Sequence, residues 1–302
     1  MSWTIKTLDL GMVELNRRRM IANAGGNGLV RVPVQGWLLM RGNDAVVIDT
    51  GFRHPDILKR LGDSAAGIER SDQRLERQLA MHGVEPGDVR YVLHTHLHSD
   101  HAGQTDLFPM STTAVVNRRE LEYAASGLSG PSYPPEDIKH MIDRLHTRGA
   151  LRLLDLELTA GEEIVDGIRC AAAGGHTEGS MLVYVDTPDG LACFCGDLVY
   201  SVRFQLLSPT TLDADPVTSA NFVVPRRAEK AALKRLLQSA PRFQLYPSHD
   251  LPVAINRGRV AQESIDSEGC GESGCWCRLL ETVGPAADAA PEASGQPAHV
   301  RG

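Results

Sequence analysis

Residues 94–101, read as HTHLHSDH, constrain the fold of this chain more than any other segment. They hold four histidines and one aspartate in eight positions, although histidine is scarce, with 11 in 302 residues. The segment directly follows a β-prone run at residues 90–93. A strand that ends in such a cluster places the side chains on a short loop fixed by the strand, as a preorganised metal site requires.

Three further β-prone runs also end in residues that can bind metal, namely His176, Asp197 and His249. One histidine at a loop end is usually an ordinary polar surface group. Together with the 94–101 segment, however, these imidazoles and carboxylates form a ligand set that suits zinc and other divalent first-row ions. The sequence therefore predicts a metal site where several strand ends meet.

Short apolar β-prone runs alternate with helical patterns along the chain. Two strands are expected on either side of a turn at residues 42–44, and runs within 163–173, 181–186 and 191–195 follow one another through turns. Helices are expected over residues 71–83 with Ser71 as N-cap and Gly83 as terminator, after Pro135, and after Pro225. Consecutive strands joined by turns indicate antiparallel sheet with helices laid on it, which is an α+β fold.

The composition of 42% hydrophobic and 23% charged residues supports a sizeable core. We expect one hydrolase domain over residues 1–280 and a disordered tail at 281–302, where Ala, Pro and Gly dominate. The net charge of −7 disfavours nucleic-acid binding. The chain shows neither a signal-peptide pattern nor a bilayer-spanning apolar run, so a cytoplasmic protein without membrane contact is expected. No Gly-rich turn indicates a nucleotide cofactor.

The six cysteines form two groups. Three lie in apolar runs, where a free thiol behaves as a small hydrophobic side chain: Cys170, Cys193 and Cys195. The other three lie near the C-terminus: Cys270, Cys275 and Cys277. The second group lacks paired Cys-x-x-Cys spacings and an evident fourth ligand. A structural metal site, a redox-active cluster and an incidental cluster remain alternatives for it.

The HLHSDH run at residues 96–101 matches the His-x-His-x-Asp-His motif of the metallo-β-lactamase fold superfamily, which this chain resembles over roughly residues 30–255. GGHTEGS, CGD and PSHD follow in the superfamily's order, and VVIDTG supplies Asp49. The resemblance implies a four-layered αβ/βα sandwich with a dinuclear metal site at one edge of two packed sheets. It also implies that Asp49 supports the metal-bearing loop from outside the ligand set.

The resemblance assigns seven ligands to two divalent ions, with zinc expected first and Mn²⁺, Co²⁺ or Fe²⁺ as alternatives. One ion would be held by His96, His98 and His176, the second by Asp100, His101 and His249, and Asp197 would bridge them. His94 precedes the motif and is left as a supporting residue at best. Two such ions share a bridging water, lower its pKa and polarise the electrophile that it attacks.

The DLVY run places Tyr200 three residues after Asp197, and this spacing resembles the N-acyl homoserine lactonase branch. A phenol there can stabilise a developing oxyanion. With Tyr200 and Asp100 as catalytic residues, we expect hydrolysis of a lactone or related carboxylic ester by a metal-bridging hydroxide. Packing of Tyr200 under the sheet is the alternative. A phosphotriester or thioester hydrolase and an iron-dependent oxidoreductase are the alternative functions, since one fold hosts many activities.

A lactone or ester with an acyl group needs an apolar wall beside the metals. Candidate lining residues are Met20, Ile21, Trp37, Phe204 and Leu206. For any one of them, ordinary packing in the core or at its rim is the favoured alternative. The Gly-rich segment over residues 17–35 is expected to be a mobile loop over the site. Its three arginines, residues 17–19, would either admit an anionic substrate or face solvent. A homodimer is the default oligomer.

Overall fold

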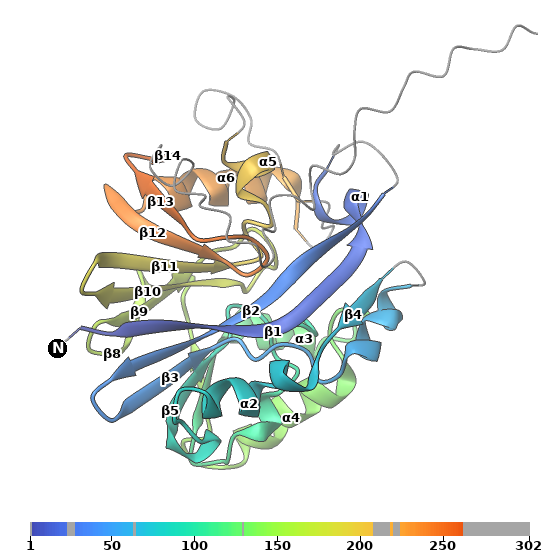
Figure 1. The fold of residues 1–302 in the computed structure, drawn as a ribbon, viewed down its shortest axis with the longest axis vertical. Coiled ribbons are helices and arrows are strands. Elements are labelled where there is room, and N and C mark those ends of the chain that lie inside the picture. Colours follow the sequence, from blue (N-terminus) through green and yellow to red (C-terminus); the bar gives the residue numbers. More distant parts are fainter. Residues whose placement is uncertain are drawn as a thin grey trace, which may run out of the picture.

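Two seven-stranded sheets pack face to face, and helices cover their outer faces (Figure 1). The computed structural model describes residues 2–22, 28–62, 65–128, 130–207, 218–219 and 224–261. The layers run helix, sheet, sheet, helix, so the predicted α+β, four-layered αβ/βα sandwich is confirmed. The predicted tail and the second group of cysteines, Cys270, Cys275 and Cys277, lie outside the described residues.

The first sheet has the strand order β4-β1-β2-β3-β5-β6-β7. Its strands are β1 (Thr4–Asn16), β2 (Leu29–Arg41), β3 (Asp44–Ile48), β4 (Ala66–Ile68), β5 (Val89–Leu93), β6 (Thr113–Asn117) and β7 (Leu151–Leu154). β4, β1, β2 and β3 pair antiparallel, whereas β3, β5, β6 and β7 pair parallel. Parallel pairing brings the carboxyl ends of β3, β5 and β6 to one edge, so the segment after β5 begins at that edge.

The second sheet has the strand order β14-β13-β12-β11-β10-β9-β8. Its strands are β8 (Glu162–Val165), β9 (Ile168–Ala172), β10 (Met181–Thr187), β11 (Gly190–Gly196), β12 (Arg242–Pro247), β13 (Val253–Asn256) and β14 (Arg259–Val260). β8 to β11 form the antiparallel run predicted from the sequence. β12 pairs parallel with β11, which brings the carboxyl ends of these two strands together.

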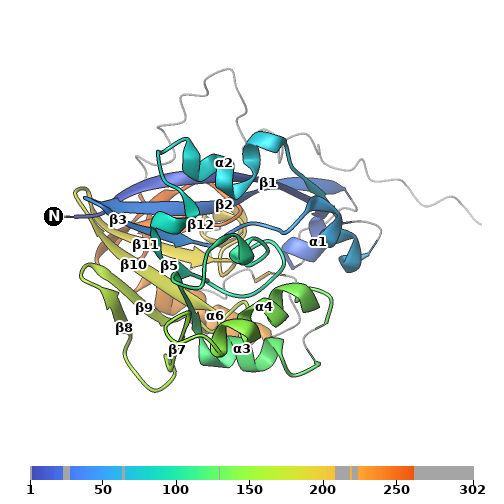
Figure 2. The ribbon, with the colours of Figure 1, turned by 90° about the horizontal axis from the view of Figure 1, so that it is seen from below.

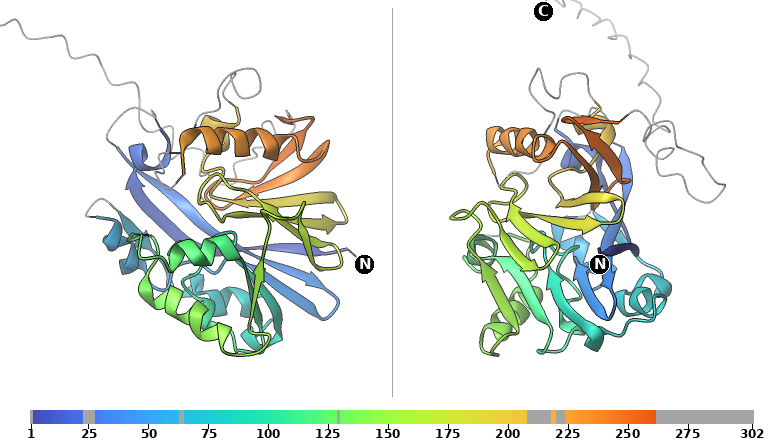
Figure 3. Two further views of the ribbon diagram at one scale, coloured as in Figure 1. Left: turned by 180° about the vertical axis from the view of Figure 1, so that it is seen from behind. Right: turned by 90° about the vertical axis from the view of Figure 1, so that its left-hand side faces the viewer.

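The helices lie on both outer faces of the sandwich (Figures 2 and 3). They are α1 (Arg17–Met20), α2 (Leu75–Ala80), α3 (Arg118–Ala124), α4 (Pro135–Leu145), α5 (Val202–Gln205) and α6 (Arg226–Leu237). Apolar residues of α2, α3 and α4 pack on the first sheet, and those of α6 pack on the second. The helices predicted after Pro135 and Pro225 are confirmed.

The predicted helix over residues 71–83 is shorter than expected. Ser71 begins a separate 3-10 turn, Ser71–Gln73, and α2 starts only at Leu75. Ser71 is therefore not the N-cap, because Arg70 and Gln73 close the turn through their own reciprocal contacts. The predicted end of the helix agrees better with the structure, because the predicted terminator Gly83 has a φ of 71° in the turn that follows α2.

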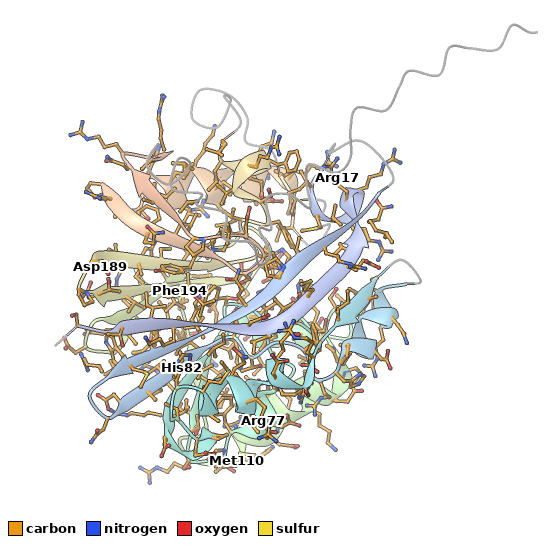
Figure 4. All side chains as sticks on the ribbon, in the orientation of Figure 1. Arg17, Arg77, His82, Met110, Asp189 and Phe194 are labelled. Carbon is orange, nitrogen blue, oxygen red and sulfur yellow. The ribbon has the colours of Figure 1, made fainter. Side chains whose placement is uncertain are left out.

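Between the sheets lies an aromatic cluster of Trp37, Phe194 and Tyr246. The ring centroids of Trp37 and Phe194 are 4.9 Å apart, and those of Phe194 and Tyr246 are 4.8 Å apart. Figure 4 marks Phe194 within the second sheet. Trp37 packs in the core and does not line the substrate pocket, because alternation along β2 turns its side chain to the inter-sheet core. Leu206 likewise packs in the core, beneath α6. Both residues follow the alternative that the sequence favoured for them.

The predicted mobile loop over residues 17–35 is largely regular structure. Residues 17–20 form α1, and β2 pairs with β1 as far out as Leu29 opposite Asn16. Residues 23–27, which include Gly25 and Gly26, lie outside the described residues, so the prediction of a mobile loop stays a prediction there. The first three cysteines agree with the prediction, because Cys170, Cys193 and Cys195 are buried free thiols.

Across the described ranges, none of the helices combines the length and the apolar character that a bilayer crossing requires. This finding agrees with the absence of a long apolar run in the sequence.

Replacement of Trp37 with alanine should destabilise the fold by about 3–5 kcal/mol, because it removes a fully buried ring from the inter-sheet cluster. Urea unfolding followed by circular dichroism measures the change. Leu158→Ala is the matched control, since Leu158 is 84% exposed and should change stability by less than about 0.5 kcal/mol. Equal stabilities of the two variants would contradict this account of the core.

Candidate metal centre

The seven residues predicted to bind metal converge at one edge of the sandwich. The 94–101 segment follows β5 of the first sheet, whereas the other three residues follow β9, β11 and β12 of the second. Two groups of possible ligand atoms result: His96, His98, His176 and Asp197 in one, and Asp100, His101 and His249 in the other. The six members other than Asp100 are at most 8% exposed.

In the first group, three imidazole nitrogens meet at close range. His96 Nε2 lies 3.1 Å from His98 Nδ1, which lies 2.9 Å from His176 Nε2. Zinc binds imidazole nitrogen at about 2.0–2.1 Å with tetrahedral geometry, so two ligating nitrogens are expected about 3.3 Å apart. The spacing of these three nitrogens therefore suits a single cation between them.

The second group combines two imidazoles with one carboxylate. His249 Nε2 lies 3.5 Å from Asp100 Oδ2, and His101 Nε2 lies 3.8 Å from Asp100 Oδ1. The Asp100 side chain is 14% exposed, more than the other ligand candidates, which gives this carboxylate access to the cavity.

Asp197 lies between the two groups and directs one carboxylate oxygen to each. Its Oδ2 is 3.5 Å from His176 Nε2, and its Oδ1 is 3.1 Å from His101 Nε2 and 3.2 Å from His249 Nε2. Within the described residues, His101 Nε2 and Asp197 Oδ1 are buried without a partner in hydrogen-bond geometry. Buried polar atoms normally have a partner, and a cation in each group would supply one.

The ionisation of these groups also favours a cation. Burial lowers the pKa of His98 to about 4, so its imidazole is neutral at pH 7 and can act as a ligand. Burial acts to raise the pKa of the Asp197 carboxyl, but His249 and His101 outweigh it and hold that pKa well below its ordinary value. Burial acts to lower the pKa of His101 and of His249, but Asp197 and the neighbouring carboxylates outweigh it and raise both pKa values. The site therefore favours positive charge beside Asp197, which a cation would supply.

Asp49 supports the site from outside both groups, as expected from the sequence. It has a φ of 55° and accepts hydrogen bonds from the backbone amide and hydroxyl of Thr95, at 2.8 and 2.7 Å. Its Oδ2 also lies 2.9 Å from His101 Nδ1. Such a contact fixes which nitrogen of a histidine faces a metal.

His94 is excluded from the site, as predicted. Its Nε2 lies 3.1 Å from the hydroxyl of Thr105, and it belongs to neither ligand group. Burial lowers the pKa of His94 to about 4, so it is a neutral side chain of the core behind the loop.

Tyr200 lies against the ligand candidates rather than under the sheet. Its ring stacks on His249, with centroids 5.3 Å apart and an interplanar angle of 3°, and it meets His176 edge-on at 5.5 Å. Burial, then the carboxylates of Asp197 and Asp100, raise the pKa of the Tyr200 phenol well above its ordinary value. The hydroxyl therefore keeps its proton and can donate a hydrogen bond.

The sequence analysis missed Glu120, a fully buried carboxylate on α3. It accepts hydrogen bonds from the amide of Leu97 at 2.9 Å and from the hydroxyls of Tyr133 and Thr177 at 3.0 and 2.6 Å. The sequence signal that could have identified Glu120 is its position four residues before Ala124, on the same face of the helix. A charged residue on the apolar face of a short helix needs buried partners.

A cavity of about 530 Å³ opens onto the site. One wall is apolar and comes from β1, α1, β2 and the 3-10 turn Pro55–Leu61: Val13, Leu15, Met20, Val32, Leu58 and Leu61. Met20 therefore lines the site as predicted, whereas Ile21 and Phe204 line a smaller adjoining cavity of about 30 Å³. Figure 4 shows Arg17 at the far end of β1 from the N-terminus, and its guanidinium lies over the Phe204 ring at 5.4 Å.

Two curated relatives are N-acyl homoserine lactonases. The chain is 30% identical to AttM of Azorhizobium caulinodans over 123 residues, a match that covers 39% of this chain and 46% of that protein. It is 26% identical to the N-acyl homoserine lactonase of Bacillus cereus over 210 residues, covering 66% of this chain and 78% of that protein. The match thus spans less than half of the first relative.

Among solved structures, the fold is similar to that of a B. thuringiensis AiiA mutant with N-decanoyl-L-homoserine bound at its active site. The TM-score is 0.66, with 20% sequence identity, and the match covers 83% of this chain and 95% of that one. At this level of identity the likeness concerns the fold.

The family assignment rests on the extent of a third match. The family model of the metallo-beta-lactamase superfamily matches residues 30–241, which is well over half of the 302 residues. This range contains the loop after β5, His176 and Asp197, and it leaves only His249 of the ligand candidates outside. The chain belongs to the metallo-beta-lactamase superfamily.

Proposed function

We propose that this protein is a dinuclear metal-dependent hydrolase that opens a lactone or cleaves a related carboxylic ester. The observation that carries the proposal is the position of Asp197, which directs one oxygen to each of two ligand groups beside a protonated tyrosine. The curated relatives that are N-acyl homoserine lactonases support the choice of a lactone.

In this proposal two cations lie in the two ligand groups, with Asp197 shared between them. His96, His98 and His176 would hold one, and Asp100, His101 and His249 the other. Zinc suits these nitrogen and carboxylate donors, as do Mn²⁺, Co²⁺ and Fe²⁺ with different preferences. When bound, such ions polarise a carbonyl and lower the pKa of water.

The protein's own residues supply the proton chemistry. Tyr200 keeps its hydroxyl proton and lies beside both His176 and His249, so it can donate to an oxyanion that forms between the ligand groups. Asp100 faces the cavity, where its carboxylate can accept the proton released by the attacking water and pass it to the leaving alkoxide. This division of roles suits a ring opening in which the carbonyl oxygen gains charge and the ring oxygen gains a proton.

The shape of the cavity supports a substrate with an apolar arm. Its apolar wall begins beside His98 and Asp100 and continues along β1 and β2. Of the three arginines at residues 17–19, Arg19 lines this cavity. Its guanidinium donates a hydrogen bond to the Leu61 carbonyl oxygen. The wall is therefore suited to an acyl group rather than to a highly charged substrate.

Phosphotriester and thioester hydrolysis on the same ligands remain the alternatives, because the metal ligands do not select the bond. An iron-dependent oxidoreductase would use the same cage with a redox-active ion. The single hydrolase domain over residues 1–280, the cytoplasmic location and the homodimer stay predictions.

The proposed activity predicts that lactones are opened rapidly. The test compares acyl homoserine lactones and aryl lactones with aryl esters, S-lactoylglutathione and a phosphotriester. Lactones should give the highest kcat/KM, because they combine a carbonyl with a tethered leaving group that needs one proton. Titration of released acid measures each rate, with metal content determined on the same sample. Fast phosphotriester cleavage without lactone opening would favour the alternative.

Replacement of Tyr200 with phenylalanine should lower kcat by about 100-fold, the order expected for loss of one oxyanion donor. The phenyl ring can still stack on His249, so metal content should stay at the wild-type value. Lactone turnover and elemental analysis measure the two quantities. Unchanged turnover would remove Tyr200 from the mechanism.

Replacement of Asp197 with alanine should lower metal content, because both ligand groups lose the carboxylate between them. Chelator treatment of the wild-type protein should likewise abolish turnover, and added Zn²⁺ should restore it. Asp189→Ala on the opposite edge of the sheet is the control and should bind metal normally. An Asp197→Ala protein that retains two ions per chain would contradict the bridging role.

A further inference from the structure

The Glu120 carboxylate ties together the two loops that carry the first ligand group. Leu97, whose amide donates to Oε1, lies between His96 and His98 in the loop after β5. Thr177, whose hydroxyl donates to Oε2, follows His176 in the loop after β9. One side chain thus holds two loops from different sheets at a fixed separation.

The approach of the second loop to α3 is unusually close. A Cβ at Gly179 would lie 2.1 Å from the backbone nitrogen of Glu120, so only glycine fits there. The Gly179 carbonyl oxygen accepts a hydrogen bond from the Asn117 side chain at 3.0 Å. The start of α3 is therefore joined to the His176 loop by backbone packing as well as by the carboxylate.

Tyr133 extends the same arrangement to the side chain of His98. Its hydroxyl donates to Glu120 Oε1, and its ring meets the His98 imidazole edge-on with centroids 4.7 Å apart. Each histidine of the first group thus has a neighbour bonded to Glu120. Because a buried carboxylate with three donors is costly to rearrange, these neighbours are held firmly.

The second ligand group depends on different partners. His101 is oriented by Asp49, and His249 Nδ1 lies 2.7 Å from the carbonyl oxygen of Pro33. Within the described part of the chain, Glu120 accepts hydrogen bonds from Leu97, Tyr133 and Thr177, and none of these residues lies in the loop after β12. The direct contacts of the two groups therefore differ, although Asp49 also binds Thr95 beside His96, and Leu97 lies in the same loop as His101.

We propose that Glu120 is a positioning residue that sets the affinity of the first ligand group for its cation. It fixes the distances between His96, His98 and His176, whose ring nitrogens would surround the ion. The inference rests on the proposed dinuclear centre. Residues that orient metal ligands typically change metal affinity by about 10–100-fold when they are altered.

The test is a stepwise metal titration of the Glu120→Gln variant. The glutamine amide has nearly the shape of the carboxylate, but it directs N–H groups at one of the hydrogen-bond donors. Metal-free protein is titrated with Zn²⁺ against a chromophoric chelator. One of the two ions should bind about 10–100-fold more weakly, and the other should bind as in the wild type. Glu122→Gln, an exposed change on the same helix, is the matched control and should leave both affinities unchanged.

Double variants identify the ion that is affected. In a His249→Ala background, which keeps the first group intact, Glu120→Gln should weaken the remaining ion by the same factor. In a His98→Ala background it should have no effect on the ion held by the second group. The absorption spectrum of bound Co²⁺ gives an independent readout, since it changes with the geometry of the ligands.

If Glu120→Gln does not fold, Thr177→Val removes one donor and leaves the carboxylate in place. The same selective loss of one ion is then expected, to a smaller extent. Two native affinities, or an equal loss at both groups, would overturn the positioning role. Wild-type protein that binds fewer than two ions would instead overturn the dinuclear centre itself.

Discussion

The buried Asp197 carboxylate is the constraint on which the rest of the centre depends. An ionised carboxylate loses several kcal/mol of hydration when it is buried, and positively charged partners with good geometry are needed to repay this. The four imidazoles within 3.8 Å of it belong to both ligand groups and come from both sheets. Because no single loop carries them all, the charge can be compensated only where the two sheets meet. The sandwich therefore determines the place of the site.

The supports of the ligands follow from the same requirement. A ligand loop is accurate only if its backbone is held as well as its side chains. Asp49 binds the first residues of the loop after β5, and Glu120 binds the middle of that loop together with the loop after β9. Both are buried carboxylates whose partners are all donors.

The sequence identified the ligand candidates because they follow β-prone runs. A local pattern of that kind can be recognised without knowledge of the fold. Asp49 and Tyr200 were identified through the resemblance to the superfamily and to its lactonase branch. The sequence could not separate lining residues such as Met20 from core residues such as Trp37 and Leu206, because the face to which a side chain points depends on which sheet or helix covers it. Glu120 was missed because its partners, Leu97, Tyr133 and Thr177, are distant in the sequence. Ser71 was misassigned because local contacts of Arg70 and Gln73 ended the turn before α2 began.

Chemistry and substrate choice are located in different parts of this fold. The ligand candidates lie on loops after β5, β9, β11 and β12, whereas the apolar wall of the cavity comes from β1, β2, α1 and the Pro55–Leu61 turn. The wall residues Val13 and Val32 are opposite each other in the β1–β2 register, so their positions depend on strand pairing and not on metal. Changes in the wall can therefore alter the size of the molecule that the cavity admits while the geometry of the ligand candidates stays constant. This separation explains physically how one superfamily fold combines a constant ligand set with different substrates.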